Sequence, residues 1–281
     1  MRRAPFTVAT LIAAHLSLGQ VPSAQEDLTA ATRERIATLN AEFRIIGDAA
    51  QARLDAANCR LGCPDTGSAL QVQTRSARDA VTAKVHAEVD AFIRRTAVPR
   101  PFNVDRIALG LRQTLPPGEP STVIRGRSAK TTGHFIAAYV VYKGDVMGPG
   151  ATSVMLRAYI RTARGVALRD VTGSDMDGYG RLSILEIRPR LSSPPEPVAE
   201  TFVLLSGYMT GANGPNNRMR LYAYDGTRFR PVWMPANEWG NFDVKMVEGG
   251  FTVVGPYYRE NRRRNERYVV SDDGLIKYQL R

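Results

Sequence analysis

Two patterns of apolar positions divide the chain, a helical one before residue 98 and an alternating one after residue 120. No proline interrupts 28–58, and apolar residues recur there every three or four positions. A second stripe follows between Ser68 and Val98, where Pro99 disfavours further helix. The stripes consist of Ile36, Leu39, Phe43, Ile46 and Ala50, and then of Val81, Val85, Val89 and Phe92. Because neither helix can bury its stripe alone, the pattern predicts an antiparallel helical hairpin.

Beyond the proline-rich segment 116–120, apolar and polar residues alternate and turn residues become frequent. This pattern is typical of strands joined by short connections, and it predicts an antiparallel meander. The expected strands are 133–142, 153–162, 166–171, 181–188, 201–209, 217–223, 227–233, 242–248, 251–254, 267–271 and 275–280. A sandwich or open barrel would bury their apolar faces, and a small four-bladed propeller is the alternative. The predicted fold class is α+β.

The first 24 residues have the order of a secretory signal peptide: two arginines, a short apolar stretch and then small residues. The apolar stretch, 6–18, is shorter than the roughly 20 residues that a membrane span requires. No cysteine lies near the expected cleavage site, so we expect no lipid attachment. We therefore predict a periplasmic or extracellular protein without a transmembrane segment. Its hairpin would cover 25–98, a linker and short connecting segment 99–120, and a β-rich domain 121–281.

The chain has two cysteines, Cys59 and Cys63, and both fall in the predicted turn between the helices. In an oxidising compartment this spacing favours a local disulfide, which would stabilise the fold by about 2 kcal/mol. Half of a metal site is the alternative reading. His86 cannot complete such a site, because it lies roughly 30 Å along the second helix. The sequence thus predicts a disulfide across the turn.

The segment 173–180 holds two aspartates, Asp175 and Asp177, among three glycines. Calcium loops of EF-hands and FG-GAP repeats begin with oxygen ligands at alternate positions, but Gly173 takes the first such position here. Arg181 takes a later acidic position of the FG-GAP loop. Since calcium requires six or more oxygens, these residues predict a tight hairpin turn over 176–178 rather than a metal site.

The hairpin around Asp225 and Gly226 decides which side chains share a face of the predicted sheet. A three-residue loop over 224–226 separates apolar from charged residues more cleanly than a two-residue loop. In that register Arg220 lies opposite Arg230, a like-charge pair that destabilises an isolated hairpin. The outward face then carries Arg218, Arg220, Tyr222, Arg228 and Arg230.

Positive charge is concentrated in the second part of the chain. Residues 25–98 hold 10 Lys+Arg and 10 Asp+Glu, whereas residues 99–281 hold 26 and 17. The segment 257–267 adds Arg259, Arg262, Arg263, Arg264 and Arg267. Such a surface suits an anionic polymer, such as an acidic polysaccharide or nucleic acid, or lipid headgroups. The alternatives are that neighbouring carboxylates neutralise the arginines or that water solvates them.

The common catalytic motifs G-x-S-x-G and H-E-x-x-H are absent from the sequence. One enzymatic alternative is a glycosidase-like pair of carboxylates, Glu238 and Asp243. Aromatic residues flank this pair: Trp233, Trp239 and Phe242. His134, at the start of a predicted strand, is the other catalytic candidate.

The sequence therefore predicts an exported, non-catalytic binding protein that uses no cofactor and recognises an anionic polymer through its arginines. A glycan-active hydrolase is one alternative. The other is a structural protein whose helical hairpin binds a protein partner or a second copy of the chain.

Overall fold

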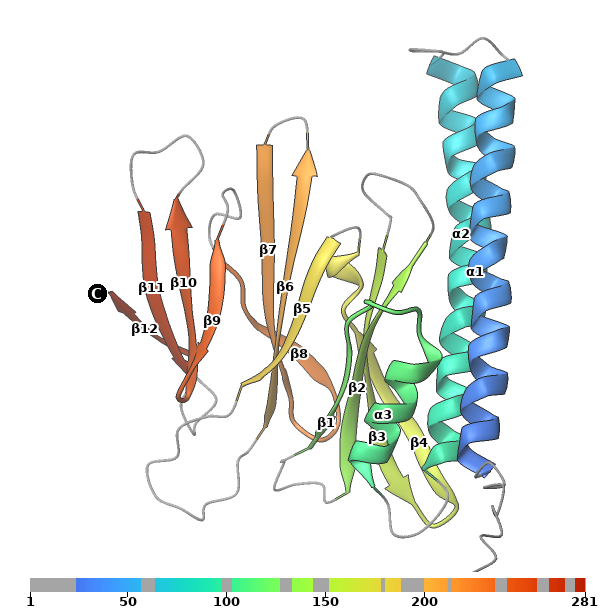
Figure 1. Cartoon of the computed structure of the whole chain (residues 1–281). Coiled ribbons are helices and arrows are strands. Elements are labelled where there is room, and N and C mark those ends of the chain that lie inside the picture. Colours follow the sequence, from blue (N-terminus) through green and yellow to red (C-terminus); the bar gives the residue numbers. More distant parts are fainter. Residues whose placement is uncertain are drawn as a thin grey trace, which may run out of the picture.

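The computed structural model describes residues 24–56, 64–97, 103–126, 133–143, 152–177, 180–187, 200–211, 214–235, 242–256, 263–270 and 276–280. Within these ranges, three α-helices precede twelve strands (Figure 1). The α+β class, with a helical hairpin in front of antiparallel meanders, is confirmed. The expected signal peptide, except for Ala24, and the expected Cys59–Cys63 disulfide lie outside the described residues and stay predictions.

Helices α1 (Ala24–Ala56) and α2 (Pro64–Thr96) lie side by side as the hairpin (Figure 1). Helix α2 begins four residues before the predicted start at Ser68. The predicted stripes face inward, because Ile36 and Phe43 of α1 and Val85 of α2 are buried in one core. The spacing of apolar residues thus located both helices and their contact.

Helix α3 (Val104–Thr114) occupies the segment that was expected to be a linker, and this corrects the prediction. Asn103 begins it by accepting hydrogen bonds from two backbone amides, at 2.9 and 3.2 Å. The apolar side of α3 is part of the core between the hairpin and sheet 1. Gly110 passes so close to Phe92 of α2 that a β-carbon there would lie 2.5 Å from the ring.

The strands form three sheets, each an antiparallel meander of four consecutive strands. Sheet 1 contains β1 (Ser121–Arg125), β2 (His134–Tyr142), β3 (Thr152–Thr162) and β4 (Gly165–Thr172). Sheet 2 contains β5 (Gly180–Ile187), β6 (Thr201–Gly211), β7 (Gly214–Tyr224) and β8 (Phe229–Trp233). Sheet 3 contains β9 (Asp243–Val247), β10 (Gly250–Pro256), β11 (Arg263–Val270) and β12 (Ile276–Leu280). All strands but β1 match predicted strands, and in the described residues they build three sheets rather than four propeller blades.

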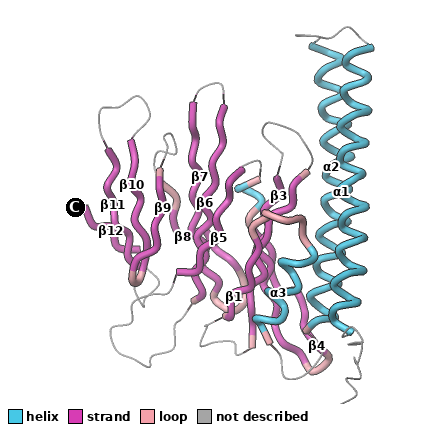
Figure 2. The backbone as a smooth tube through the Cα atoms, viewed as in Figure 1, coloured by secondary structure: helices cyan, strands magenta, loops and turns pink. Residues whose placement is uncertain are grey.

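The layers follow the order of the chain: the helices, then sheet 1, sheet 2 and sheet 3 (Figures 1 and 2). Three apolar cores lie between successive layers. Phe135 of β2 faces the helices, whereas its neighbour Ile136 faces sheet 2. In the same way Val203 of β6 faces sheet 1 and Phe202 faces sheet 3. Strands β2 and β6 are therefore apolar on both faces, as expected for sheets covered on both sides.

Candidate functional site

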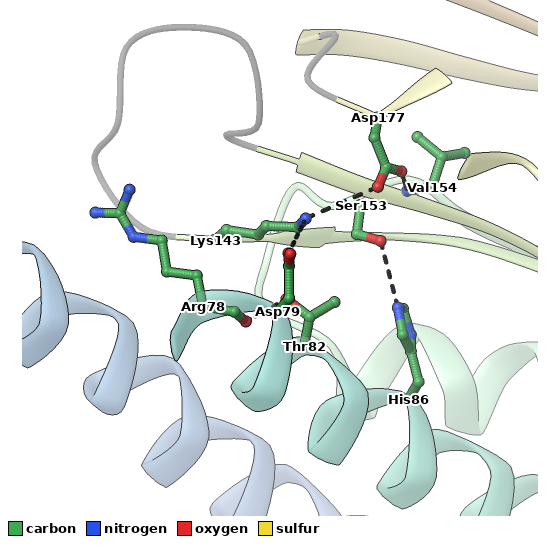
Figure 3. Close-up of polar contacts among 8 residues, drawn as sticks. All are labelled: Arg78, Asp79, Thr82, His86, Lys143, Ser153, Val154 and Asp177. Atoms are coloured by element: carbon green, nitrogen blue, oxygen red, sulfur yellow. Dashed lines mark hydrogen bonds and ion pairs between the residues drawn. The ribbon is translucent and has the colours of Figure 1, made fainter. Parts of the chain in front are cut away.

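Polar side chains lie between α2 and sheet 1, in a place where the sequence indicated only apolar packing (Figure 3). Lys143, directly after β2, is 7% exposed. Its Nζ lies 3.3 Å from Oδ1 of Asp79 on α2 and 3.8 Å from Oδ2 of Asp177. A buried ammonium group requires such partners, because burial of an unpaired charge is costly. Lys143 therefore ties the helix to the sheet.

His86 of α2 makes the second connection in this row. Its Nδ1 lies 3.1 Å from the Tyr139 hydroxyl. Its Nε2 lies 3.3 Å from Oγ of Ser153 (Figure 3). Burial, and then the charges of Arg157 and Lys143, lower the pKa of His86 to about 3. The ring is therefore neutral at neutral pH. Although a His–Ser pair can begin a nucleophilic site, Ser153 is only 2% exposed, so the pair links helix and sheet.

Asp90 makes the third connection, one turn further along α2. It accepts a hydrogen bond of 2.8 Å from the Tyr159 hydroxyl of β3 and lies 3.6 Å from the Arg157 guanidinium. Burial, and then the charge of Asp90, raise the pKa of Tyr159 above its usual value. Asp79, His86 and Asp90 thus fix one face of α2 on sheet 1 through polar groups.

The segment 173–177 connects two sheets, so the predicted hairpin turn at 176–178 is wrong. Strand β4 ends in sheet 1 and β5 begins in sheet 2, and the short 3-10 helix η1 (Ser174–Met176) lies between them. Gly173 has φ 109°, which a side chain rarely tolerates. Met176 enters the core between sheets 1 and 2. The glycine and the aspartates of this segment therefore belong to a connection from sheet 1 to sheet 2.

Both aspartates of this segment bind protein groups. Asp177 accepts a 2.7 Å hydrogen bond from the Val154 amide and also faces Lys143. Asp175 accepts hydrogen bonds from Arg220, at 3.1 Å, and from the Tyr222 hydroxyl. In the part of the chain that is described, no group of three or more His, Cys, Asp or Glu side chains could hold a metal ion.

The register of the β7–β8 hairpin differs from the predicted one. Tyr224 pairs with Phe229, which leaves a four-residue loop over 225–228. The Asp225 carboxylate accepts hydrogen bonds from the amides of Thr227 and Arg228, at 2.8 and 2.9 Å. An aspartate that bonds to amides two and three residues ahead stabilises its own turn. The prediction failed because the loop has four residues, in which Gly226 has φ 96° and the Asp225 side chain binds two amides.

The predicted opposition of Arg220 and Arg230 is consequently wrong. Arg230 pairs with Ala223 across the hairpin. It binds both oxygens of Glu200, with N–O distances of 2.9 and 2.5 Å. Arg220 is 13% exposed and donates to Asp175 at 3.1 Å. Both guanidinium groups therefore have carboxylate partners that the sequence analysis did not identify.

The remaining predicted binding residues are dispersed. Arg218 donates to the Asp175 backbone carbonyl at 2.9 Å, and Tyr222 is buried. Arg264 is also buried, 3.1 Å from a Glu266 oxygen. The others are Arg228 and Arg263, which are exposed, Arg267, which is half-buried, and Arg259 and Arg262, which lie outside the described residues.

The enzymatic candidates are also separated. His134 is buried at the start of β2, with its ring 5.2 Å from that of Tyr224. Glu238 and Trp239 lie outside the described residues, so the carboxylate pair stays a prediction. Asp243 begins β9 and is exposed, whereas Trp233 packs against Phe251 and Tyr268 in the core between sheets 2 and 3.

One cleft brings functional groups together, and the sequence analysis named only one of its polar residues, Asp243. It lies between sheets 2 and 3 and has a volume of about 360 Å³. Its walls are Ser183, Leu185, Ser206, Gly207, Tyr208, Asn217, Phe242, Asp243 and Val244. The sequence contained a signal for this cleft: along alternate positions of β6, the apolar Phe202 and Leu204 are followed by the polar Ser206 and Tyr208.

No protein-family model, curated protein or solved structure matches this chain. None of the helices in the described ranges combines the length and apolar character that crossing a membrane requires.

Proposed function

We propose that this chain is an exported, non-catalytic interaction protein whose helical hairpin binds a second copy of itself. The observation that carries the proposal is the extension of the hairpin well past sheet 1 (Figure 1). The polar contacts described between α2 and sheet 1 begin at Asp79. We call residues 44–56 and 64–78 the projecting half of the hairpin, and residues 24–43 and 79–96 the basal half.

The projecting half lacks a core of its own. Among its described side chains, Leu70 is the one that is buried. Two large apolar side chains, Ile45 and Val72, are instead 66% and 64% exposed. Two paired helices bury little apolar surface, whereas four-helix bundles enclose a continuous core. A second hairpin packed on the first would cover this surface.

Charge favours this mode of contact. The segment 25–98 has equal numbers of basic and acidic residues, whereas residues 99–281 carry nine more basic than acidic ones. Two copies therefore repel each other through their β regions and least through their hairpins. A neutral surface of mixed charge is also a poor binding site for an anionic polymer, so it suits a second hairpin better.

A non-catalytic role is supported by the state of the reactive groups. His86 and His134 are buried, and Lys143 has carboxylate partners. General acid–base catalysis requires a titratable group within reach of a substrate, and these side chains face the protein interior. Export is supported by the order of charged, apolar and small residues in the first 24 positions.

The test is the molar mass in solution, by size-exclusion chromatography with light scattering, for wild type and for Ile45→Asp/Val72→Asp. We expect a dimer for wild type at micromolar concentration, and for the variant a folded monomer whose melting temperature does not depend on protein concentration. Leu109→Asp is the matched control, since Leu109 of α3 is 54% exposed but lies outside the projecting half. A monomeric wild type at 100 µM, or a variant that stays dimeric, would rule out the proposal.

A further inference from the structure

The cleft between sheets 2 and 3 is a candidate ligand-binding site. Its volume of about 360 Å³ falls within the range of small-molecule sites, which runs from about 300 to 1,000 Å³. The cleft is lined by residues of sheets 2 and 3, whereas the hairpin lies on the far side of sheet 1 (Figures 1 and 2). A ligand bound there is independent of the self-association proposed above.

The cleft originates in a change of side-chain chemistry along one face of sheet 2. Alternate residues of a strand share a face, and on β6 Phe202 and Leu204 pack against sheet 3. The next residues on that face, Ser206 and Tyr208, are polar and line the cleft. Sheets 2 and 3 therefore pack through apolar side chains along one part of their interface, and polar side chains line the cleft along the other part.

The neighbouring strands change at the same level. On β7, the apolar Met219 is followed on this face by Asn217, and on β5 the partly buried Leu185 is preceded by Ser183. Ser183 pairs with Ser206, and Asn217 pairs with Tyr208, so the polar side chains are adjacent across the strands. Three strands thus contribute to one polar patch, which does not arise from a single substitution in the core.

Asn217 also fixes the opposite wall. It is buried, and its Nδ2 donates a 3.1 Å hydrogen bond to the Phe242 carbonyl directly before β9. The residue that follows, Asp243, has an exposed side chain and lines the cleft. The start of sheet 3 is therefore held against sheet 2, and Asp243 lies at the edge of the cleft.

The lining selects a class of ligand. The hydroxyls of Ser183, Ser206 and Tyr208 can both donate and accept hydrogen bonds. None of the described residues that line the cleft is Lys or Arg, so these residues offer an anionic group no compensating charge. Adjacent hydroxyl groups of a sugar match this set, and the Tyr208 ring offers an apolar face for its C–H groups. We propose that the cleft binds a neutral sugar residue.

The experiment is a screen of the wild-type protein on a printed array of neutral, acidic and amino glycans. It is followed by calorimetric titration with the neutral glycan that binds best. We expect binding to at least one neutral glycan. Ser206→Ala should weaken it about three- to tenfold, because one neutral hydrogen bond is lost. Tyr208→Phe should weaken it about three- to tenfold, as expected for the loss of one neutral hydrogen bond.

Matched controls are Ser76→Ala on α2 and Tyr142→Phe at the end of β2, both exposed and remote from the cleft. We expect both controls to bind as wild type does. Absence of binding to every neutral glycan would overturn the proposal, as would equal affinity of the cleft variants and the controls. Binding confined to acidic glycans would also overturn it and would point to the arginines instead.

Discussion

The two halves of the helical hairpin share the same helices but differ in what they contact. In the basal half, Val85, Val89 and Phe92 are buried, and three polar groups of α2 bind sheet 1. In the projecting half, Leu70 alone is buried among the described side chains. The contrast shows that the basal half serves the core of the molecule. The projecting half contributes little to that core, and for this reason we propose that it binds a second copy of the chain.

The largest expected difference between the halves is in stability. Phe92→Ala should lower the free energy of unfolding by about 3–5 kcal/mol, because it leaves a cavity between the hairpin and α3. Val72→Ala should change it by less than about 0.5 kcal/mol, since this side chain is mainly exposed. Urea unfolding, at a protein concentration where the chain is monomeric, measures both. Similar losses for the two variants would contradict the division of the hairpin.

The pH dependence of stability should come from two groups that contact sheet 1, His86 of the basal half and Glu119. The pKa of His86 is lowered to about 3 from an ordinary value of 6.5, so its contribution is complete above pH 6.5 and is lost as the pH falls toward 3. Glu119, which follows α3, accepts a hydrogen bond from the Tyr142 amide. Burial raises the pKa of Glu119 from 4.5 to about 7. Its contribution is complete below pH 4.5 and is lost as the pH rises through 7.

Because these slopes oppose each other between pH 4.5 and 6.5, we expect a plateau of stability there. Thermal melts of His86→Gln should show stability falling by roughly 1–3 kcal/mol from pH 4.5 to 7. Melts of Glu119→Gln should show it rising from pH 3 to 6.5. A plateau that persists in both variants would contradict these assignments.

The smallest expected effect concerns the arginines of sheet 2. Arg220→Gln/Arg230→Gln should lower stability by about 1–2 kcal/mol, because it leaves Asp175 and Glu200 without charged partners. Arg228→Gln is the matched control, since this side chain is exposed in the loop, and it should have little effect. Melting temperatures and retention on a heparin column test both roles of these arginines. A double variant that is as stable as wild type and elutes at lower salt would support the anionic-polymer prediction instead.

Regular periodicity was sufficient to predict most of the elements. The 3–4 spacing that includes Ile36 and Phe43 located the hairpin, and alternation located eleven of the strands. Helix α3 was missed because it is short and lies between proline-rich segments, although Asn103 followed by Val104, Ile107 and Leu111 was a readable signal. The predicted β7–β8 register was wrong because the loop is one residue longer than expected, and hydrogen bonds of the Asp225 side chain to two amides stabilise it.

The candidate sites were harder to predict because their contacts are not local. Asp175 meets Arg220 across 45 positions, and Glu200 meets Arg230 across 30. Only the packing of sheet 1 on sheet 2 brings the first pair together. His86 and Ser153 are likewise separated by 67 positions. Periodicity shows which face a residue occupies, but it does not show which residue of another layer that face will meet.

The most direct test of the proposed function is amide hydrogen exchange along α1 and α2 at low and high protein concentration. If the projecting half pairs with a second copy, its amides near Ile45 and Val72 should exchange more slowly at high concentration. The amides of the basal half near Val85 and Phe92 should exchange at the same rate under both conditions. Exchange in the projecting half that does not depend on concentration would contradict the account.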